Sequence, residues 1–211
     1  MLPRALHQFE VPIAEAVVDF GTAVGWEFAA FLKAPQGPLI EMRSQAQPDG
    51  ADPSGDVKLL AAAGVPVVVH HNHLSQESLS GPDWFGLCEL FSETFAHCAD
   101  GTVYWGQAID HPSIRASTTG SNDVPAMNAL FSILDAAGVS DAADLSGFFR
   151  KEVLNRAMLV RGFVKYGYSW GNQPVNPRPG PGSPQTGPAG ITGASIDHLI
   201  DRAAAQLAPS L

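Results

Sequence analysis

The N-terminal region of the chain carries a helical apolar period followed by two β-type runs. Residues 11–24 have apolar side chains at helical spacing, and Pro12 suits the first turn of a helix. Residues 26–32 are almost continuously aromatic or apolar, which favours a strand. Turn-forming residues at 34–37 separate this run from a second one at 38–43. The pattern therefore predicts a helix followed by a β-hairpin.

A β-branched run at residues 65–71 predicts a buried central strand. It follows a polar, Gly/Pro-rich loop at 47–56 and a short helix at 57–63 that ends at Gly64. Farther along, the pattern predicts a helix over 82–97, a strand over 102–109, a loop over 114–122, helices over 126–137 and 145–164, and a terminal helix over 194–207.

Strands and helices alternate along most of the chain, which predicts an α/β (α+β) protein with a mixed central sheet flanked by helices. We expect one domain over about residues 1–170, with a C-terminal helical extension from about residue 110. Residues 171–193 are dense in glycine and proline, a composition typical of linkers. The segment 171–211 is therefore predicted to be a linker followed by a short terminal helix.

Composition and charge narrow the possible partners. Hydrophobic residues make up 45% of the chain and charged residues 16%, which is enough apolar material for a folded core. The formal net charge of −9 argues against nucleic acid as the main partner, since an acidic surface repels phosphates. Neither a secretory signal nor an apolar run long enough to span a membrane is evident, so we expect a soluble, cytoplasmic protein. Export as an effector or toxin without a cleaved signal remains an alternative.

The central strand ends in the segment His70-His71-Asn72-His73, which suggests a metal site. Residues two apart on a strand point to the same side, so the imidazoles of His71 and His73 can reach one ion. Asp83, ten residues after His73, is the candidate third ligand. Two histidines and one carboxylate suit a catalytic zinc that keeps its fourth position for water. Ser80 and Asp83 also match a helix capping box, a role compatible with metal binding.

This segment resembles the motif of the JAB/MPN-type metallopeptidases, known as the JAMM motif, and in particular their bacterial branch. The family has an upstream Glu, then His-x-His, seven residues, Ser, two residues and Asp. Here His71-Asn72-His73 is followed by six residues, Ser80, two residues and Asp83, and Leu74 stands where the family usually has Pro. The resemblance extends to element order over about residues 10–109. It implies the cytidine-deaminase-like fold of that family.

The resemblance also implies roles for individual residues. Glu27, at the start of the first strand, matches the family's upstream acid and would act as general base on a zinc-activated water. Ser80 would hydrogen-bond the oxyanion. Two alternatives stay open: Glu27 on an edge strand facing water, and Glu41 as the base. The remaining polar residues near the motif are given lesser roles: Glu77 solvated, Asn72 orienting the loop, His70 structural, and none for His97, His111 and His198.

By the same resemblance, the expected activity is hydrolysis of a peptide or isopeptide bond. The expected substrate is the C-terminal tail of a ubiquitin-like or other small protein, bound as an extended strand. The alternative is a catalytically inactive, JAB-like protein-binding module. A zinc deaminase would need a Cys-x-x-Cys pair, whereas Cys88 and Cys98, the two cysteines of the chain, are ten residues apart.

Overall fold

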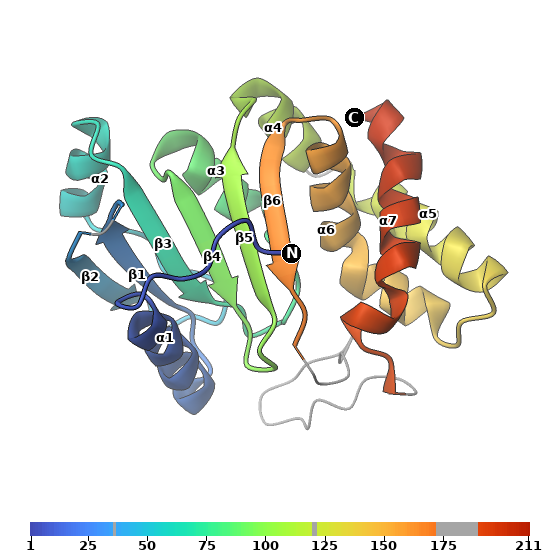
Figure 1. Ribbon diagram of the computed structural model, residues 1–211, viewed down its shortest axis with the longest axis horizontal. Coiled ribbons are helices and arrows are strands. Elements are labelled where there is room, and N and C mark those ends of the chain that lie inside the picture. The colour runs from blue at the N-terminus through green and yellow to red at the C-terminus, as the bar shows by residue number, and fades with distance from the viewer. Residues whose placement is uncertain (36, 120–121, 172–189) are drawn as a thin grey trace.

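Six strands form one mixed sheet in the computed structural model, which describes residues 1–35, 37–119, 122–171 and 190–211. The strand order is β2-β1-β3-β4-β5-β6 (Figure 1). Only the central pair β3–β4 is parallel, and the other neighbours are antiparallel. The strands are β1 (Phe28–Lys33), β2 (Leu39–Ser44), β3 (Val67–Asn72), β4 (Glu93–His97), β5 (Val103–Ala108) and β6 (Val164–Ser169). The predicted mixed α/β class is thereby confirmed.

Helices flank this sheet. They are α1 (Val11–Val24), α2 (Gly55–Ala62), α3 (Gly81–Glu89), α4 (His111–Thr118), α5 (Asp123–Ala136), α6 (Ala142–Val160) and α7 (Asp197–Leu207), with short 3-10 turns η2 (Gly193–Ile196) and η3 (Ala208–Ser210). Figure 1 shows α5, α6 and α7 gathered beside β6, and α7 packs on both α5 and α6. No helix within the described ranges is both long and apolar enough to cross a membrane.

Side-chain alternation along the strands builds a separate core on each face of the sheet. On one face, Ala30 and Leu32 of β1 pack against Val17 of α1. The same face carries Phe95 and Trp105, which are covered by the N-terminal segment. The opposite face of the sheet carries the larger core, which includes residues of α3, α5, α6 and α7. Histidines at successive positions of β3 therefore face different surroundings.

The helix predicted over 82–97 is wrong in its second half. Helix α3 ends at Glu89, and Glu93–His97 is the strand β4. Leu90, Phe91 and Phe95 happen to extend the apolar period of α3, but Phe95 pairs in register with His70 of β3. Parallel pairing between β3 and β4, which are separated by a helix, leaves no local pattern in the sequence. A short apolar run is also compatible with either a helix or a strand.

Two predictions in the C-terminal half are also wrong. The loop predicted over 114–122 is mostly helix α4, which begins where Asp110 accepts a hydrogen bond from the backbone N–H of Ser113. The helix predicted over 145–164 ends at Val160, because Gly162 adopts φ +73° and the chain then forms β6. The terminal helix is present as α7. Most of the linker predicted over 171–193 lies outside the described residues.

Candidate metal centre

The end of β3 and the start of α3 bring three potential metal ligands together. The Nε2 atoms of His71 and His73 lie 2.9 Å apart. Oδ1 of Asp83 is 3.0 Å from Nε2 of His71, and Oδ2 is 3.6 Å from Nε2 of His73. Among the described residues these three form the one group of this kind with ligand atoms all within 4.8 Å of one another. The residues expected from sequence as metal ligands thus converge.

The donor set fits a small divalent cation. A tetrahedral zinc with bonds of about 2.0–2.1 Å holds its ligand atoms about 3.3 Å apart. The Nε2–Nε2 separation of 2.9 Å and the 3.0 Å between Asp83 Oδ1 and His71 Nε2 are close to that value, while the 3.6 Å to His73 Nε2 is measured from the other oxygen, Oδ2. With one ligand atom from each side chain, the three atoms lie within 4.8 Å of one another, so they could hold such an ion and leave a fourth position free.

Each histidine has a partner on its other ring nitrogen. Nδ1 of His73 lies 2.8 Å from the backbone carbonyl of Glu77, so it must be the protonated nitrogen that donates. In neutral His73 the lone pair is consequently on Nε2, directed at the site. Nδ1 of His71 lies 3.4 Å from the hydroxyl of Thr94 on β4. Such outer partners orient the rings of metal-binding histidines.

Asp83 is held by the residue at the start of its own helix. Its Oδ2 accepts hydrogen bonds of 2.7 Å from both the backbone N–H and the hydroxyl of Ser80. The six-residue spacer between His73 and Ser80 therefore still brings Asp83 to the histidines. Because the single hydroxyl proton of Ser80 is donated to Asp83, Ser80 orients a carboxylate in this arrangement and does not present a donor to the cavity.

The two carboxylates of the site differ in how strongly their surroundings favour ionisation. Burial disfavours charge on Asp83, but His71 and His73 outweigh that effect and hold its pKa well below the usual value. Burial also disfavours protonation of His73, yet the hydrogen bond and charge of Asp83 raise the pKa of His73. Glu27 differs, because burial dominates and raises its pKa against the opposing charges of His71 and His73. The negative charge is thus concentrated beside the two imidazoles.

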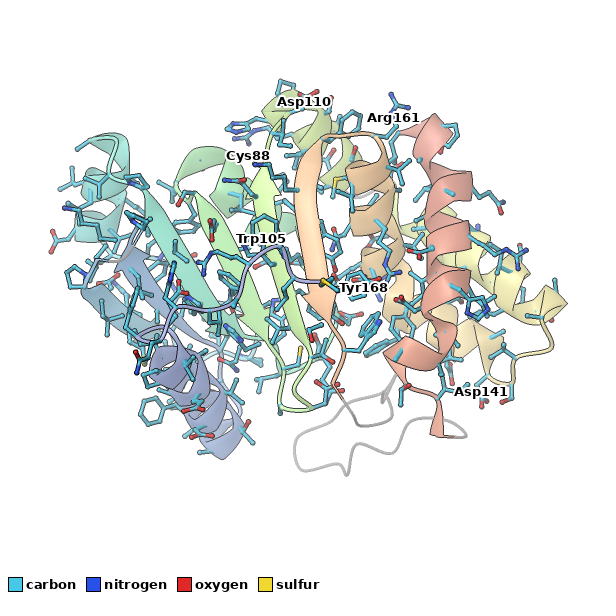
Figure 2. The ribbon with its side chains drawn as sticks, viewed as in Figure 1. Cys88, Trp105, Asp110, Asp141, Arg161 and Tyr168 are labelled. Atoms are coloured by element: carbon cyan, nitrogen blue, oxygen red, sulfur yellow. The ribbon has the colours of Figure 1, made fainter. Side chains whose placement is uncertain are left out.

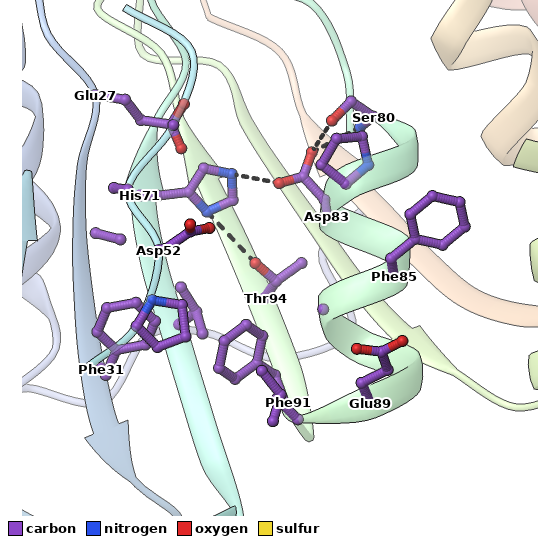
Figure 3. A pocket seen from close by; sticks show the side chains of 18 of the residues that line it. Glu27, Phe31, Asp52, His71, Ser80, Asp83, Phe85, Glu89, Phe91 and Thr94 are labelled. Atoms are coloured by element: carbon purple, nitrogen blue, oxygen red, sulfur yellow. Dashed lines mark hydrogen bonds and ion pairs between the residues drawn. The ribbon is translucent and has the colours of Figure 1, made fainter. Parts of the chain in front are cut away.

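Glu27 lies beside the histidines and not on a solvent-facing edge. Figure 3 shows its carboxylate and that of Asp83 on opposite sides of the His71 ring. The backbone around Glu27 is fixed by Asn72, whose side chain accepts from Phe28 N–H at 2.7 Å and donates to the Trp26 carbonyl at 3.2 Å. Asn72 therefore positions the candidate base, and its predicted role in orienting the loop is wrong.

A cavity of about 530 Å³ extends from this centre across the sheet. Phe31 and Phe91 line the part of the cavity that lies away from Ser80, and Phe85 lines it from α3, nearer to Asp83 (Figure 3). Residues 49–53 of the polar loop form part of its wall. Its charged lining residues are Glu27, Asp49, Asp52, Asp83 and Glu89, with Lys58 as the cation. The cavity is thus lined by both carboxylates and aromatic rings.

Two predictions for acidic residues can be compared with the structure. Glu41 lies away from the cavity lining and accepts a hydrogen bond from the backbone N–H of Ser54 at 2.8 Å, so it is poorly placed as a base. The prediction that Glu77 is solvated is wrong, because its carboxylate pairs with Arg150 and Lys151.

His97 was predicted to have no role, which is also wrong. His70 does point to the face opposite His71, where its Nδ1 lies 3.0 Å from Nε2 of His97. Its Nε2 lies 3.4 Å from the carboxylate of Glu10, a residue whose importance sequence reasoning missed. Both histidines are buried, so they form part of a polar cluster inside that face of the sheet.

Comparisons of the chain with protein-family models, with curated protein sequences and with solved structures found no match. Any assignment of function therefore depends on the fold and on the chemistry of this centre.

Proposed function

We propose that this protein is a zinc-dependent metallopeptidase of the JAB/MPN type that hydrolyses a peptide or isopeptide bond. One observation carries the proposal: His71, His73, Asp83 and Glu27 converge at one end of an acidic cavity from three separate segments of the chain. The mixed sheet with β3 at its centre is compatible with the cytidine-deaminase-like fold of that family.

In this proposal His71, His73 and Asp83 hold the zinc. The bound ion would supply a Lewis acid and lower the pKa of its water to about 7. Glu27 would accept the proton of the attacking water and deliver it to the leaving nitrogen. Ser80 would keep Asp83 in position through its two hydrogen bonds. Donation from Ser80 to an oxyanion would first require its hydroxyl to leave Asp83.

The proposed substrate is an extended protein or peptide segment, with the tail of a ubiquitin-like protein as the class implied by the motif. The charge of the cavity wall favours a neutral or basic substrate segment and disfavours an acidic one. The reason is that carboxylates outnumber cations in the wall even after a divalent ion binds. The same charge balance disfavours nucleic acid as a partner.

The test begins with zinc content and with cleavage of ubiquitin-like fusions and peptide amides, with and without chelator. We expect about one zinc per chain and chelator-sensitive cleavage. Glu27→Gln should keep the zinc and lose about 10²–10⁴-fold in turnover. Glu41→Gln is the matched control and should retain both properties.

The competing function is a protein-binding module without catalysis, which the engagement of the Ser80 hydroxyl by Asp83 favours. A wild-type protein that binds zinc but cleaves nothing in the panel would support this module. Purified protein that takes up no zinc would overturn the metallopeptidase proposal.

A further inference from the structure

The loop between His73 and Asp83 is attached to the C-terminal half of the chain. Every residue from Gln76 to Leu79 has a polar contact with a residue beyond position 100. The backbone carbonyl of Gln76 accepts a hydrogen bond of 3.2 Å from the hydroxyl of Tyr104 on β5. The other three residues contact α6 or β6. The C-terminal half is thus hydrogen-bonded to the segment that joins two candidate ligands.

Glu77 links this attachment to the metal centre directly. Its backbone carbonyl accepts the Nδ1 hydrogen bond of His73 at 2.8 Å. Its carboxylate is bound by two cations of α6, with Oε1 2.7 Å from Arg150 Nη1 and Oε2 2.8 Å from Lys151 Nζ. The side chains of all three are only 16–29% exposed. Movement of the Glu77 carboxylate would therefore also move the Glu77 carbonyl, which orients the ring of His73.

Asn155, one turn farther along α6, fixes the next two residues of the loop. Its amide nitrogen donates to the hydroxyl of Ser78 at 2.8 Å and to the carbonyl of Leu79 at 2.9 Å. Its amide oxygen accepts from the indole of Trp84 in α3 at 2.8 Å. One buried side chain therefore joins the loop before Asp83 to the helix that carries Asp83.

We infer that Arg150, Lys151 and Asn155 are positioning residues for the metal centre, acting on His73 and Asp83 through Glu77, the hydroxyl of Ser78 and the carbonyl of Leu79. This inference rests on the proposed metal site. Outer partners of metal-binding histidines commonly change metal affinity by about 10–100-fold when removed. Here the partner of His73 is a carbonyl in a loop, and α6 is the helix that holds this loop.

The partly exposed pair on α6 offers a test that does not depend on refolding the core. The variants are Glu77→Ala and the double variant Arg150→Ala/Lys151→Ala, because each removes the clamp but keeps the carbonyl of residue 77. Arg115→Ala, which breaks the exposed pair between Arg115 and Glu89 of α3, is the matched control. Zn²⁺ affinity is measured by competition with a chromophoric chelator, and thermal unfolding is measured on the metal-free proteins.

We expect both clamp variants to bind Zn²⁺ at least tenfold more weakly than the wild type, with nearly unchanged unfolding temperatures of the metal-free proteins. Combining Glu77→Ala with the double variant should cause little further loss of Zn²⁺ affinity, because both changes remove the same interaction. Lys151→Arg keeps the cation and should therefore retain most of the Zn²⁺ affinity. Arg115→Ala should bind Zn²⁺ as tightly as the wild type.

Unchanged Zn²⁺ affinity in the clamp variants would overturn this inference and leave the proposed metal site intact. A loss of affinity that is matched by an equal loss in the Arg115→Ala control, or explained by unfolding of the metal-free variants, would likewise overturn it. A wild-type protein that binds no Zn²⁺ would instead overturn the proposed function, a result distinguishable from the other two.

Discussion

The Nε2 atoms of His71 and His73 lie 2.9 Å apart, closer than two imidazole lone pairs can approach without a positive charge or a shared proton between them. The Nδ1 proton of His73 is committed to the carbonyl of Glu77, which directs the Nε2 lone pair at this gap. The carboxylate of Asp83 faces both rings. We therefore predict that a divalent ion occupies this gap, where it would contact all three groups at once.

Removal of the metal should therefore destabilise the protein. A ligand at a thousand times its dissociation constant adds about 4 kcal/mol to the free energy of unfolding. For a domain of this size that corresponds to roughly 8–16 °C in the melting temperature. Calorimetry with and without chelator measures the shift. His71→Ala/His73→Ala should abolish it, whereas His198→Ala, an exposed histidine, should retain it in full. Equal melting temperatures with and without chelator in the wild type would contradict the prediction.

A single methyl group on α1 should disturb the candidate base from a distance. A Cβ added at Gly21 would lie 2.1 Å from Nδ2 of Asn72, the side chain that fixes the backbone on both sides of Glu27. We expect Gly21→Ala to lower the free energy of unfolding by about 1–3 kcal/mol through overpacking. It should also reduce any peptidase activity without removing the metal ligands.

The control for that substitution is Gly147→Ala in α6, where an added Cβ meets nothing within 4 Å. It should stabilise the protein by roughly 0.5–1 kcal/mol, since alanine is the better helix former. Urea unfolding measures both variants. Equal effects at the two positions would show that contact with Asn72 is unimportant.

The buried carboxylate of Glu10 should make stability fall in acid. Burial alone would raise its pKa, but hydrogen bonds from His70, Arg4 and the backbone N–H of His7 hold the pKa well below the usual 4.5. The unfolded state then binds the proton more readily, so this contribution is present above about pH 4.5 and is lost as pH falls below it. One such group changes the free energy of unfolding by at most about 1.4 kcal/mol per pH unit.

Urea unfolding at several pH values between 6 and 3 tests this prediction. The wild type should lose more stability over that range than Glu10→Gln, which lacks the titrating group. Glu15→Gln on α1 serves as the control, because its carboxylate is solvent-exposed. Parallel pH profiles for the wild type and Glu10→Gln would refute the assignment.

Arg156 should be the most sensitive charged residue of the C-terminal layer. It is buried and pairs at 2.7 Å with Glu152 of its own helix and with Asp197 of α7. Its guanidinium also lies 4.0 Å from the ring of Tyr168, labelled on β6 in Figure 2. Arg156→Ala leaves the buried carboxylate of Glu152 with the hydroxyl of Tyr166 but without its cation, which should cost about 3–5 kcal/mol.

Chemical denaturation measures how much free energy of unfolding is lost in Arg156→Ala and in Arg115→Ala. The exposed pair of Arg115 with Glu89 should be worth about 0.5 kcal/mol or less. A loss of similar size in both variants would mean that burial of Arg156 adds nothing to its contribution.

The convergence of the three candidate metal ligands could be predicted because their signal is local. His71 and His73 are two residues apart at the end of a β-branched run, and alternation along a strand requires them to share a side. Ser80 and Asp83 have the spacing of a helix start, where backbone N–H groups hold a carboxylate. Helix α1 was predicted within its observed bounds for the same reason, since its apolar period is contained in its own sequence.

What the sequence did not reveal depends on contacts between distant segments. Thr94 reaches His71 only because β4 pairs in parallel with β3, a pairing that the helical period through Phe95 concealed. The clamp on Glu77 comes from residues 73 and 74 positions away in the chain. Such contacts are decided by which surfaces pack together, and no spacing along the chain encodes them.

Sequence alone therefore determined the residue types and local order of the candidate metal centre: two histidines, two residues apart at the end of a strand, and an acid at the next helix start. The tertiary structure decided which acid stands beside them, because Asn72 joins the end of β3 to the backbone on both sides of Glu27. It also decided that α6 supports the intervening loop. Periodicity predicts local secondary structure, because it depends on residues that are close together in the chain. The residues that hold the ligands in place come from distant segments and are brought together only by packing.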